Sequence, residues 1–217
     1  MASTNINPTR MELTRLKGRL ATAQRGHKLL RDKRDELMRR FWEIVFRNRE
    51  LRTRVEEGLT RANRAMAMAT AVMGPGMLEQ ALLYPKQRVK VKTRTENLVG
   101  VNVPRYDIEV TVSDAAAIYP YGFAQTSGEL DTAIDTLSEV FQDMLELAEI
   151  EKTMQLLAEE IEKTRRRVNA LEHVMIPEMQ RNIKYIAMKL EENDRSAKAR
   201  LMKVKDKVLK QAHGYAD

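Results

Sequence analysis

An uninterrupted heptad repeat near the start of the chain constrains the fold more than any other feature. With position a at Leu13 and position d at Leu16, a 3-4 spacing of mostly apolar residues continues to Val72 without a proline. A repeat held over more than eight heptads is typical of a long α-helix that packs along another helix as a coiled coil. At 1.5 Å per residue such a helix would extend about 90 Å.

The two ends of this helix carry recognisable start and stop residues. Asn7 or Thr9 offers a cap, and Pro8 would lie in the first turn. The sequence "MGPG" at 73–76 forbids continuation, because glycine and proline both end helices. We therefore expect residues 1–73 to form the N-terminal long helix of the coiled coil.

A second long apolar series occupies residues 129–217. It begins with Leu130, Leu137 and Met144, and after Leu171 it steps by fours to Ile183 before the 3-4 spacing returns. The extra fours are a stutter, which locally unwinds a left-handed supercoil, and Pro177 inside it should bend the helix. The simplest arrangement pairs the two long helices with each other, antiparallel. The predicted seam comprises Leu13, Leu16, Leu20, Leu30, Leu37, Ile44, Leu51, Leu157, Ile161, Val168, Leu171, Ile183, Ile186 and Leu190.

The central insert, residues 74–128, has a different pattern. Between about 87 and 112 β-branched residues alternate with polar ones, which predicts a β-hairpin turning at Gly100 or at 102–105. An isolated two-stranded hairpin is marginal, so this one should lean on a helix or a partner. The expected fold is mainly α: a long antiparallel two-helix left-handed coiled coil formed by the N- and C-terminal helices, with a short β-hairpin insert in the middle.

The net charge of +7 is unevenly distributed. Residues 10–40 and 181–210 are strongly basic, whereas residues 126–162 are strongly acidic. If both basic segments lie at one end, that end is a tip suited to an acidic partner, although a solvated helix surface without a partner is the alternative reading. The predicted basic tip comprises Arg10, Arg15, Lys17, Arg19, Arg25, Lys28, Lys198, Arg200, Lys203, Lys205 and Lys207.

Catalytic and cofactor motifs are missing from the sequence. The only glycine cluster, at 74–76, is not followed by the Gly-Lys-Ser/Thr of a phosphate-binding loop. His27, His173 and His213 lack metal-ligand spacing and are expected to be packing or surface residues. Cysteine is absent, which fits a reducing compartment. We expect no catalytic residue, cofactor or metal, and no secretory signal or membrane span.

Two other functions fit parts of the pattern. A basic helix with heptads suggests nucleic-acid binding, but here the basic residues overlay the heptads instead of preceding them, and stacking aromatics are missing. A stand-alone scaffold also fits, but it does not explain two matched helices joined by a β insert. We therefore do not expect a nucleic-acid partner.

Three segments resemble a known family. Residues 7–37, "NPTRMELTRLKGRLATAQRGHKLLRDKRDEL", resemble the N-terminal helix of the family of V-type ATPase D subunits. Residues 165–205, "RRRVNALEHVMIPEMQRNIKYIAMKLEENDRSAKARLMKVK", resemble its C-terminal helix, and "NLVGVNVP" at 97–104 resembles its central insert. The resemblance covers nearly the whole chain, and the chain is similar to bacterial or archaeal-type members.

The resemblance implies a non-catalytic central rotor shaft, cytoplasmic and peripheral to the membrane. Such a shaft turns inside a hexamer of A and B subunits, and its base meets the small F subunit of the central stalk and a funnel-shaped subunit on the membrane ring. The basic tip would then face the hexamer, and polar a positions such as His27, Arg34 and Asn48 would select one register. Lys90, Lys92 and Arg94 of the hairpin are candidate partner contacts or, equally, solvated edge charges. The transported ion, proton or sodium, and the balance of ATP synthesis and hydrolysis are not encoded here.

Overall fold

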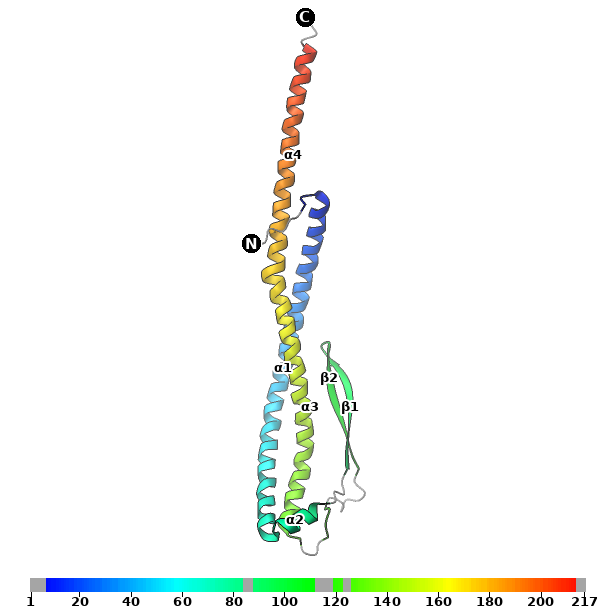
Figure 1. Cartoon of the computed structure of the whole chain (residues 1–217), viewed down its shortest axis with the longest axis vertical. Coiled ribbons are helices and arrows are strands. Elements are labelled where there is room, and N and C mark those ends of the chain that lie inside the picture. The colour runs from blue at the N-terminus through cyan, green and yellow to red at the C-terminus, as the bar shows by residue number, and fades with distance from the viewer. Residues whose placement is uncertain (1–6, 84–87, 112–118, 123–125, 214–217) are drawn as a thin grey trace. The chain divides into compact units, whose positions relative to one another are not determined.

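The computed structural model describes residues 7–83, 88–111, 119–122 and 126–213. Its elements, in chain order, are α1 (Arg10–Met73), α2 (Pro75–Leu82), β1 (Arg88–Leu98), β2 (Val101–Thr111), α3 (Gly128–Ala170), the π-helical turn η1 (Leu171–Met175) and α4 (Ile176–His213) (Figure 1). The mainly α fold with long N- and C-terminal helices and a central hairpin is confirmed.

The chain forms two compact units. The terminal unit contains Met1–Arg34 and Lys163–Asp217, and the central unit contains Asp35–Glu162. Each unit holds one part of α1 packed against one part of the C-terminal helices. The segmentation expected from the sequence, with breaks after residues 73 and 128, follows the elements instead of these units and stays a prediction.

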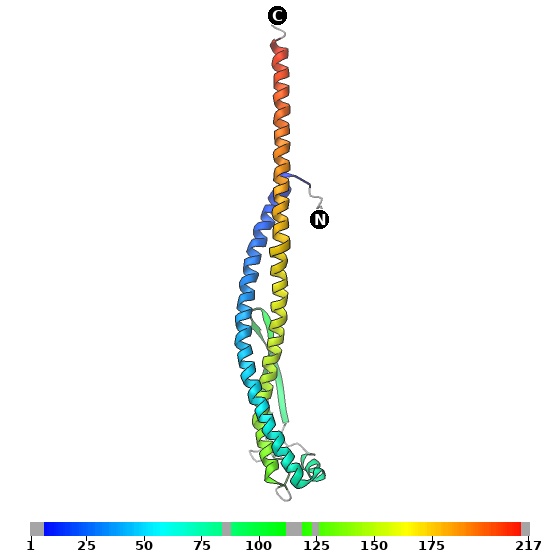
Figure 2. The same cartoon turned by 90° about the vertical axis from the view of Figure 1, so that its left-hand side faces the viewer.

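The helices run antiparallel within each unit. In the terminal unit Arg10 Nη2 lies 3.2 Å from Asp194 Oδ2, and His27 lies beside Glu172. In the central unit Arg54 Nη2 lies 4.0 Å from Asp143 Oδ1, whereas the earlier Arg47 pairs with the later Glu146. In both units an earlier residue of α1 therefore meets a later residue of the partner helix, and two views follow the helices side by side (Figures 1 and 2).

The ends of α1 follow from local chemistry. Thr9 Oγ1 accepts a hydrogen bond from the Glu12 backbone N–H at 3.2 Å, so Thr9 is the cap. Pro8 precedes this cap, whereas we expected it inside the first turn. At the other end Gly74 adopts φ 78°, a left-handed conformation that suits glycine, and α2 starts directly after it.

The core consists of small and branched apolar side chains along the facing sides of the helices. Leu37 and Leu51 of α1 and Leu130 and Leu157 of α3 are fully buried. Of the predicted seam residues, some are buried: Leu16, Leu37, Leu51, Leu157, Val168 and Ile186. The others are half-buried: Leu13, Leu20, Leu30, Ile44, Ile161, Leu171, Ile183 and Leu190.

The first part of α3 packs differently from the apolar series predicted there. Leu137 and Met144 are 42% and 37% exposed, whereas Ala133 and Val140 are buried. Val140 packs against Gly58 of α1. Small residues face each other at this level, so the two backbones approach closely and the larger leucine and methionine turn outward.

The predicted stutter takes the form of a π turn. In the terminal unit the residues that face α1 include Thr164, Leu171, Met179 and Ile186. The successive spacings between these four are 7, 8 and 7 residues, so one extra residue lies between Leu171 and Met179. The extra residue falls inside η1, where the Ile176 backbone N–H bonds to the Leu171 carbonyl, five residues back. A π turn absorbs one residue without rotating the seam away from its partner. It also widens the helix just before Pro177, whose ring would clash with a carbonyl one turn earlier.

The hairpin pairs β1 with β2 antiparallel, from Arg88 opposite Thr111 to Leu98 opposite Val101. Of the two turn sites considered, the chain turns at Gly100. Val99 and Gly100 have φ values of 53° and 80°, the signs that a type I′ turn requires. Asn97 Oδ1 accepts a hydrogen bond from the Gly100 N–H at 3.0 Å. This bond offsets the strain of a β-branched residue at positive φ.

Candidate interaction surfaces

The predicted basic tip lies in the terminal unit, and all of its members are exposed. Six belong to α1 and five to α4. Arg10 pairs with Asp194, and Arg15 Nε lies 3.6 Å from Glu12 Oε2. These exposed pairs each contribute little to stability, so the cations remain available to exchange partners.

The last part of α4 adds an apolar stripe to this basic surface. Every described side chain from 197 to 210 is exposed, because α1 begins near Asp194 and offers no partner beyond it (Figures 1 and 2). Leu201, Val204 and Val208 follow one helix face at spacings of three and four residues. A solvated helix end is marginal alone, and an exposed apolar stripe on it indicates a contact surface.

Polar residues at predicted a positions have different surroundings. His27 is largely covered, and its Nε2 lies 3.3 Å from Glu172 Oε2 beside the π turn. Asn48 is only 8% exposed, and its Nδ2 has no hydrogen-bond partner among the described residues. Arg34 is half-buried. A buried polar group in a seam lowers stability, and it selects a register when other registers would bury it in a less favourable place.

An aromatic stripe on α1, in the central unit, was not identified from the sequence as a surface. Met38, Trp42 and Phe46 recur every four residues, and Trp42 and Phe46 are 53% and 69% exposed. The ring centroids of Trp42 and Phe46 lie 6.5 Å apart. Trp42 lies between the a position Phe41 and the d position Ile44 and occupies neither, which is the sequence signal that could have identified it as a surface residue. We call Met38, Trp42 and Phe46 the aromatic stripe.

Ion pairs border the aromatic stripe. Arg39 Nη2 donates to Glu36 Oε1 at 2.7 Å, and Arg40 Nη1 lies 3.1 Å from Glu43 Oε2. The hydrogen bond from Arg39 holds the pKa of the Glu36 carboxyl below its ordinary value. The aromatic stripe is thus edged by charges that already neutralise one another, which suits a mainly apolar contact.

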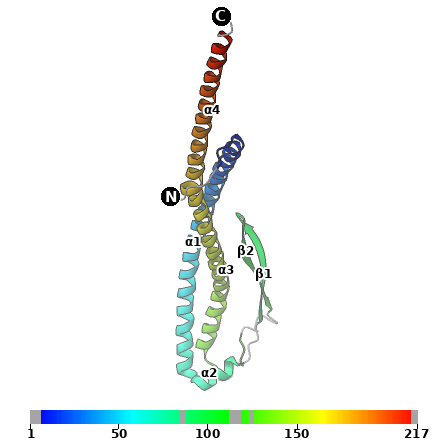
Figure 3. The same cartoon turned by 45° about the horizontal axis from the view of Figure 1, so that its top comes forward.

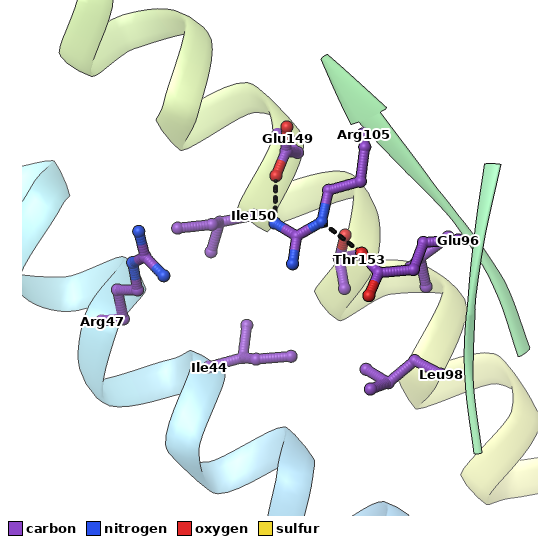
Figure 4. Close-up of a pocket in the computed structure, with 9 residues that line it drawn as sticks. Ile44, Arg47, Glu96, Leu98, Arg105, Glu149, Ile150 and Thr153 are labelled. Carbon is purple, nitrogen blue, oxygen red and sulfur yellow. Dashed lines mark hydrogen bonds and ion pairs between the residues drawn. The ribbon is translucent and has the colours of Figure 1, made fainter. Parts of the chain in front are cut away.

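The hairpin docks on α3 through one carboxylate (Figure 4). Arg105 Nη1 donates to Glu149 Oε1 at 2.6 Å, and the Tyr106 backbone N–H donates to Glu149 Oε2 at 2.7 Å. Arg105 Nε also donates to Glu96 Oε2 at 2.6 Å, so both strands are tied to the helix. Hydrogen bonds to Glu96 and then to Glu149 raise the pKa of Arg105. β2 is the strand nearer α3 (Figures 1 and 3).

A small cavity of about 90 Å³ lies between the hairpin and the helix pair of the central unit. Apolar, polar and charged residues line it: Ile44, Arg47, Glu96, Leu98, Val103, Arg105, Glu149, Ile150 and Thr153. Val103 is buried there, at 3% exposure. The cavity is too small to suit a drug-sized ligand.

The predicted hairpin contacts Lys90, Lys92 and Arg94 lie on β1 and are exposed. Lys92 Nζ lies 2.5 Å from Glu109 Oε1, and Arg94 Nε lies 2.5 Å from Asp107 Oδ2. Two of the three cations are therefore engaged across the hairpin. These cross-strand ion pairs stabilise the pairing of β1 with β2, and this role requires no partner protein.

Neither a metal centre nor a membrane span is found in the part of the chain that the structure describes. No group of three His, Asp or Glu residues there could hold a metal ion. The helices of the described ranges also lack a stretch long and apolar enough to cross a bilayer.

Comparison with known proteins gives consistent similarities. Residues 12–206 match the family described as the D subunit of ATP synthase. A protein of Acetivibrio thermocellus, named as the D subunit of a V-type ATP synthase, is 58% identical over 217 residues, covering 100% of this chain and 98% of that protein. Proteins of the same name from Clostridioides difficile and Clostridium novyi are 58% and 54% identical, with 98% and 97% of this chain covered and 95% and 98% of the relatives.

Proposed function

Because the chain belongs to the family of ATP synthase D subunits, we propose that it is the central rotor shaft of a rotary V-type ATPase. As a non-catalytic component of that complex, peripheral to the membrane on its cytoplasmic side, it passes torque between the A/B hexamer and the ion-translocating ring. The observation that carries this proposal is full-length similarity to proteins named as this component.

The helix architecture supports a shaft. A single chain supplies both antiparallel helices, and α1 alone runs for 64 residues without a break. Packed helix pairs resist bending and twisting better than isolated helices, because each side chain in the seam is held by the opposite helix. One copy suffices to build the pair, which fits one rotor per assembly.

We place the hexamer contact at the basic tip together with the apolar stripe of Leu201, Val204 and Val208. Exposed cations form weak, screened contacts that exchange as a rotor turns. The apolar stripe adds contact area. Because it is narrow, it should bind the hexamer less tightly than a fully apolar tip would. The expected bearing surface is therefore acidic, with apolar patches.

The tip assignment is tested by neutralising its charges. Changing Lys203, Lys205 and Lys207 to Gln should weaken binding to the A/B hexamer, more strongly at low salt. The matched control changes three exposed arginines of α1 outside the tip: Arg52, Arg61 and Arg64. Equal affinity of the tip variant and the wild type would overturn the charge contact while leaving the shaft in place.

We further propose that the aromatic stripe receives the small F subunit of the stalk, with the docked hairpin beside the funnel-shaped subunit. Exposed Trp and Phe side chains on a rigid helix are typical centres of protein interfaces. Trp42 is the only tryptophan of the chain, so its fluorescence reports directly on this surface. Binding of the F subunit should shift its emission to shorter wavelength.

A matched pair of variants tests this contact. Phe46→Ser should weaken binding of the F subunit by about tenfold or more, the usual cost of truncating an interface aromatic. Met68→Ser changes a similarly exposed apolar residue elsewhere on α1 and should leave binding unchanged. If the F subunit binds without a change in Trp42 emission, the contact lies on another surface.

The shaft itself is tested by isolating the chain with its partners from nuclease-treated lysate at about 150 mM salt. Recovery of two large nucleotide-binding subunits and a small subunit in fixed ratio supports the proposal. Recovery of the chain only as a self-associated species would favour a scaffold, and DNA affinity that falls steeply with salt would favour a nucleic-acid binder.

A further inference from the structure

The contact between the hairpin and α3 is concentrated on Glu149. Both oxygens of this carboxylate accept hydrogen bonds from β2, one from the Arg105 side chain and one from the Tyr106 backbone N–H. Its side chain is only 12% exposed. Within the ranges that the structure describes, the polar contacts between the hairpin and α3 end on this one side chain. Charge-assisted bonds of this kind are the strong ones.

The hairpin itself is held by contacts that do not involve Glu149. Lys92 with Glu109 and Arg94 with Asp107 cross between the strands, and the backbone ladder spans both strands entirely. The Asn97 side chain closes the turn. These contacts would persist if the hairpin left the helices, so its pairing and its docking are separable.

Apolar packing beneath the hairpin is incomplete. Val103 is buried against the helix pair, but the cavity of about 90 Å³ remains beside it. Missing packing atoms weaken the dispersion contribution of such a contact. The hydrogen bonds to Glu149 therefore carry an important part of the docking.

A second arginine, Arg47 of α1, lines the same cavity as Glu149. On α3, Asp143, Glu146 and Glu149 follow one another at spacings of three residues, on the same helix side. Arg47 of α1 pairs with Glu146, and it lines the same cavity as Arg105 and Glu149 (Figure 4). Arg47 could bridge Glu146 and Glu149 when Arg105 leaves.

We propose that the hairpin is a releasable arm and that Glu149 is its latch. In the docked state Arg105 and Tyr106 occupy Glu149; in the released state Arg47 does. The exchange keeps the carboxylate paired in both states, which lowers the cost of release because no buried charge is left alone. Release uncovers Val103 and Leu98 on the arm. This inference concerns the chain itself and stands whether or not the shaft assignment holds.

The test measures the distance between the arm and α3 in the full chain. The chain contains no cysteine, so Thr95→Cys and Lys152→Cys create two unique positions for spin labels. Wild type should give one narrow distance distribution. Glu149→Gln and Glu149→Ala should shift the ratio of released to docked arm by at least about tenfold, as expected for losing charge-assisted bonds. Glu151→Gln, an exposed change on the same helix, should leave the distribution unchanged.

Two further measurements keep the outcome decisive. Amide hydrogen exchange should show that β1 and β2 stay protected in Glu149→Ala. Strands that lose protection together with docking would overturn a releasable arm.

The arginine variants test the exchange of partners at Glu149. Arg105→Gln should release the arm partly, and adding Arg47→Gln should return it toward α3. An unchanged ratio after adding Arg47→Gln would overturn the arginine exchange, and unchanged distances in both Glu149 variants would overturn the latch.

Discussion

Gly58 of α1 and Val140 of α3 fit so closely that a methyl group on the glycine would overlap Cγ2 of the valine. Both residues are buried in the central unit. Glycine in a helix interior usually costs stability, so its presence here is explained by the space it leaves for Val140. The close approach sets which side of α3 faces α1.

Gly58→Ala should therefore destabilise the protein despite the better helix propensity of alanine. We expect the free energy of unfolding to fall by about 1–3 kcal/mol, the usual cost of overpacking a core. Gly18→Ala is the control, because it adds a methyl group to an exposed helical glycine with nothing within 4 Å, and it should raise stability by about 0.5–1 kcal/mol. Denaturant unfolding measures both, and equal effects at the two glycines would contradict the close fit.

Asn48→Leu should stabilise the central unit. The wild-type amide is buried with its Nδ2 unpaired among the described residues, a defect that costs about 1–3 kcal/mol. Asn63→Leu, an exposed change on the same helix, should alter stability by less than about 0.5 kcal/mol. Thermal unfolding compares the two variants, and a loss of stability in Asn48→Leu would show that the amide is satisfied in solution.

Deleting Val174 should remove the π turn and leave the fold intact. The deletion restores a spacing of seven between Leu171 and Met179, so all later seam residues keep facing α1. We expect no loss of helicity by circular dichroism and an unchanged or higher melting temperature. Deleting the exposed Lys184 instead turns the fully buried Ile186 out of the seam and should destabilise the terminal unit. Equal damage from both deletions would mean that the π turn has a packing role of its own.

Tyr121 should ionise late in an alkaline titration. Burial first, and then the hydrogen bond that its hydroxyl donates to Asp131 at 2.6 Å, raise its pKa above the ordinary value. A hydrogen bond to Asp135 raises the pKa of Tyr119 as well. The folded state favours the neutral phenols. Their contribution to the free energy of unfolding is therefore complete below the ordinary pKa of about 10 and is lost as the pH rises above it.

Ultraviolet absorbance of tyrosinate checks this order. Tyr121→Phe should remove part of the late step and flatten the loss of stability at high pH. Tyr185→Phe, at an exposed position, should leave the late step in place. A late step of the same size in Tyr121→Phe would assign it to other tyrosines.

The sequence alone determined the long N- and C-terminal helices, the central hairpin and the family. Heptad spacing defines one apolar side on a helix, glycine and proline mark its end, and alternation defines a strand, so these features need no knowledge of neighbours. Resemblance over nearly the whole chain then identified the family.

The tertiary structure determined three features that depend on contacts between elements. They are the choice of buried residues in α3, the π turn and the attachment of the hairpin to Glu149. Ala133 and Val140 are buried in place of Leu137 and Met144 because Gly58 lets the backbones approach, and no periodicity within α3 encodes that choice. The extra residue before Met179 became a π turn because the seam on both sides is already engaged with α1. Glu149 holds the hairpin because folding brings residues more than forty positions apart within hydrogen-bonding distance.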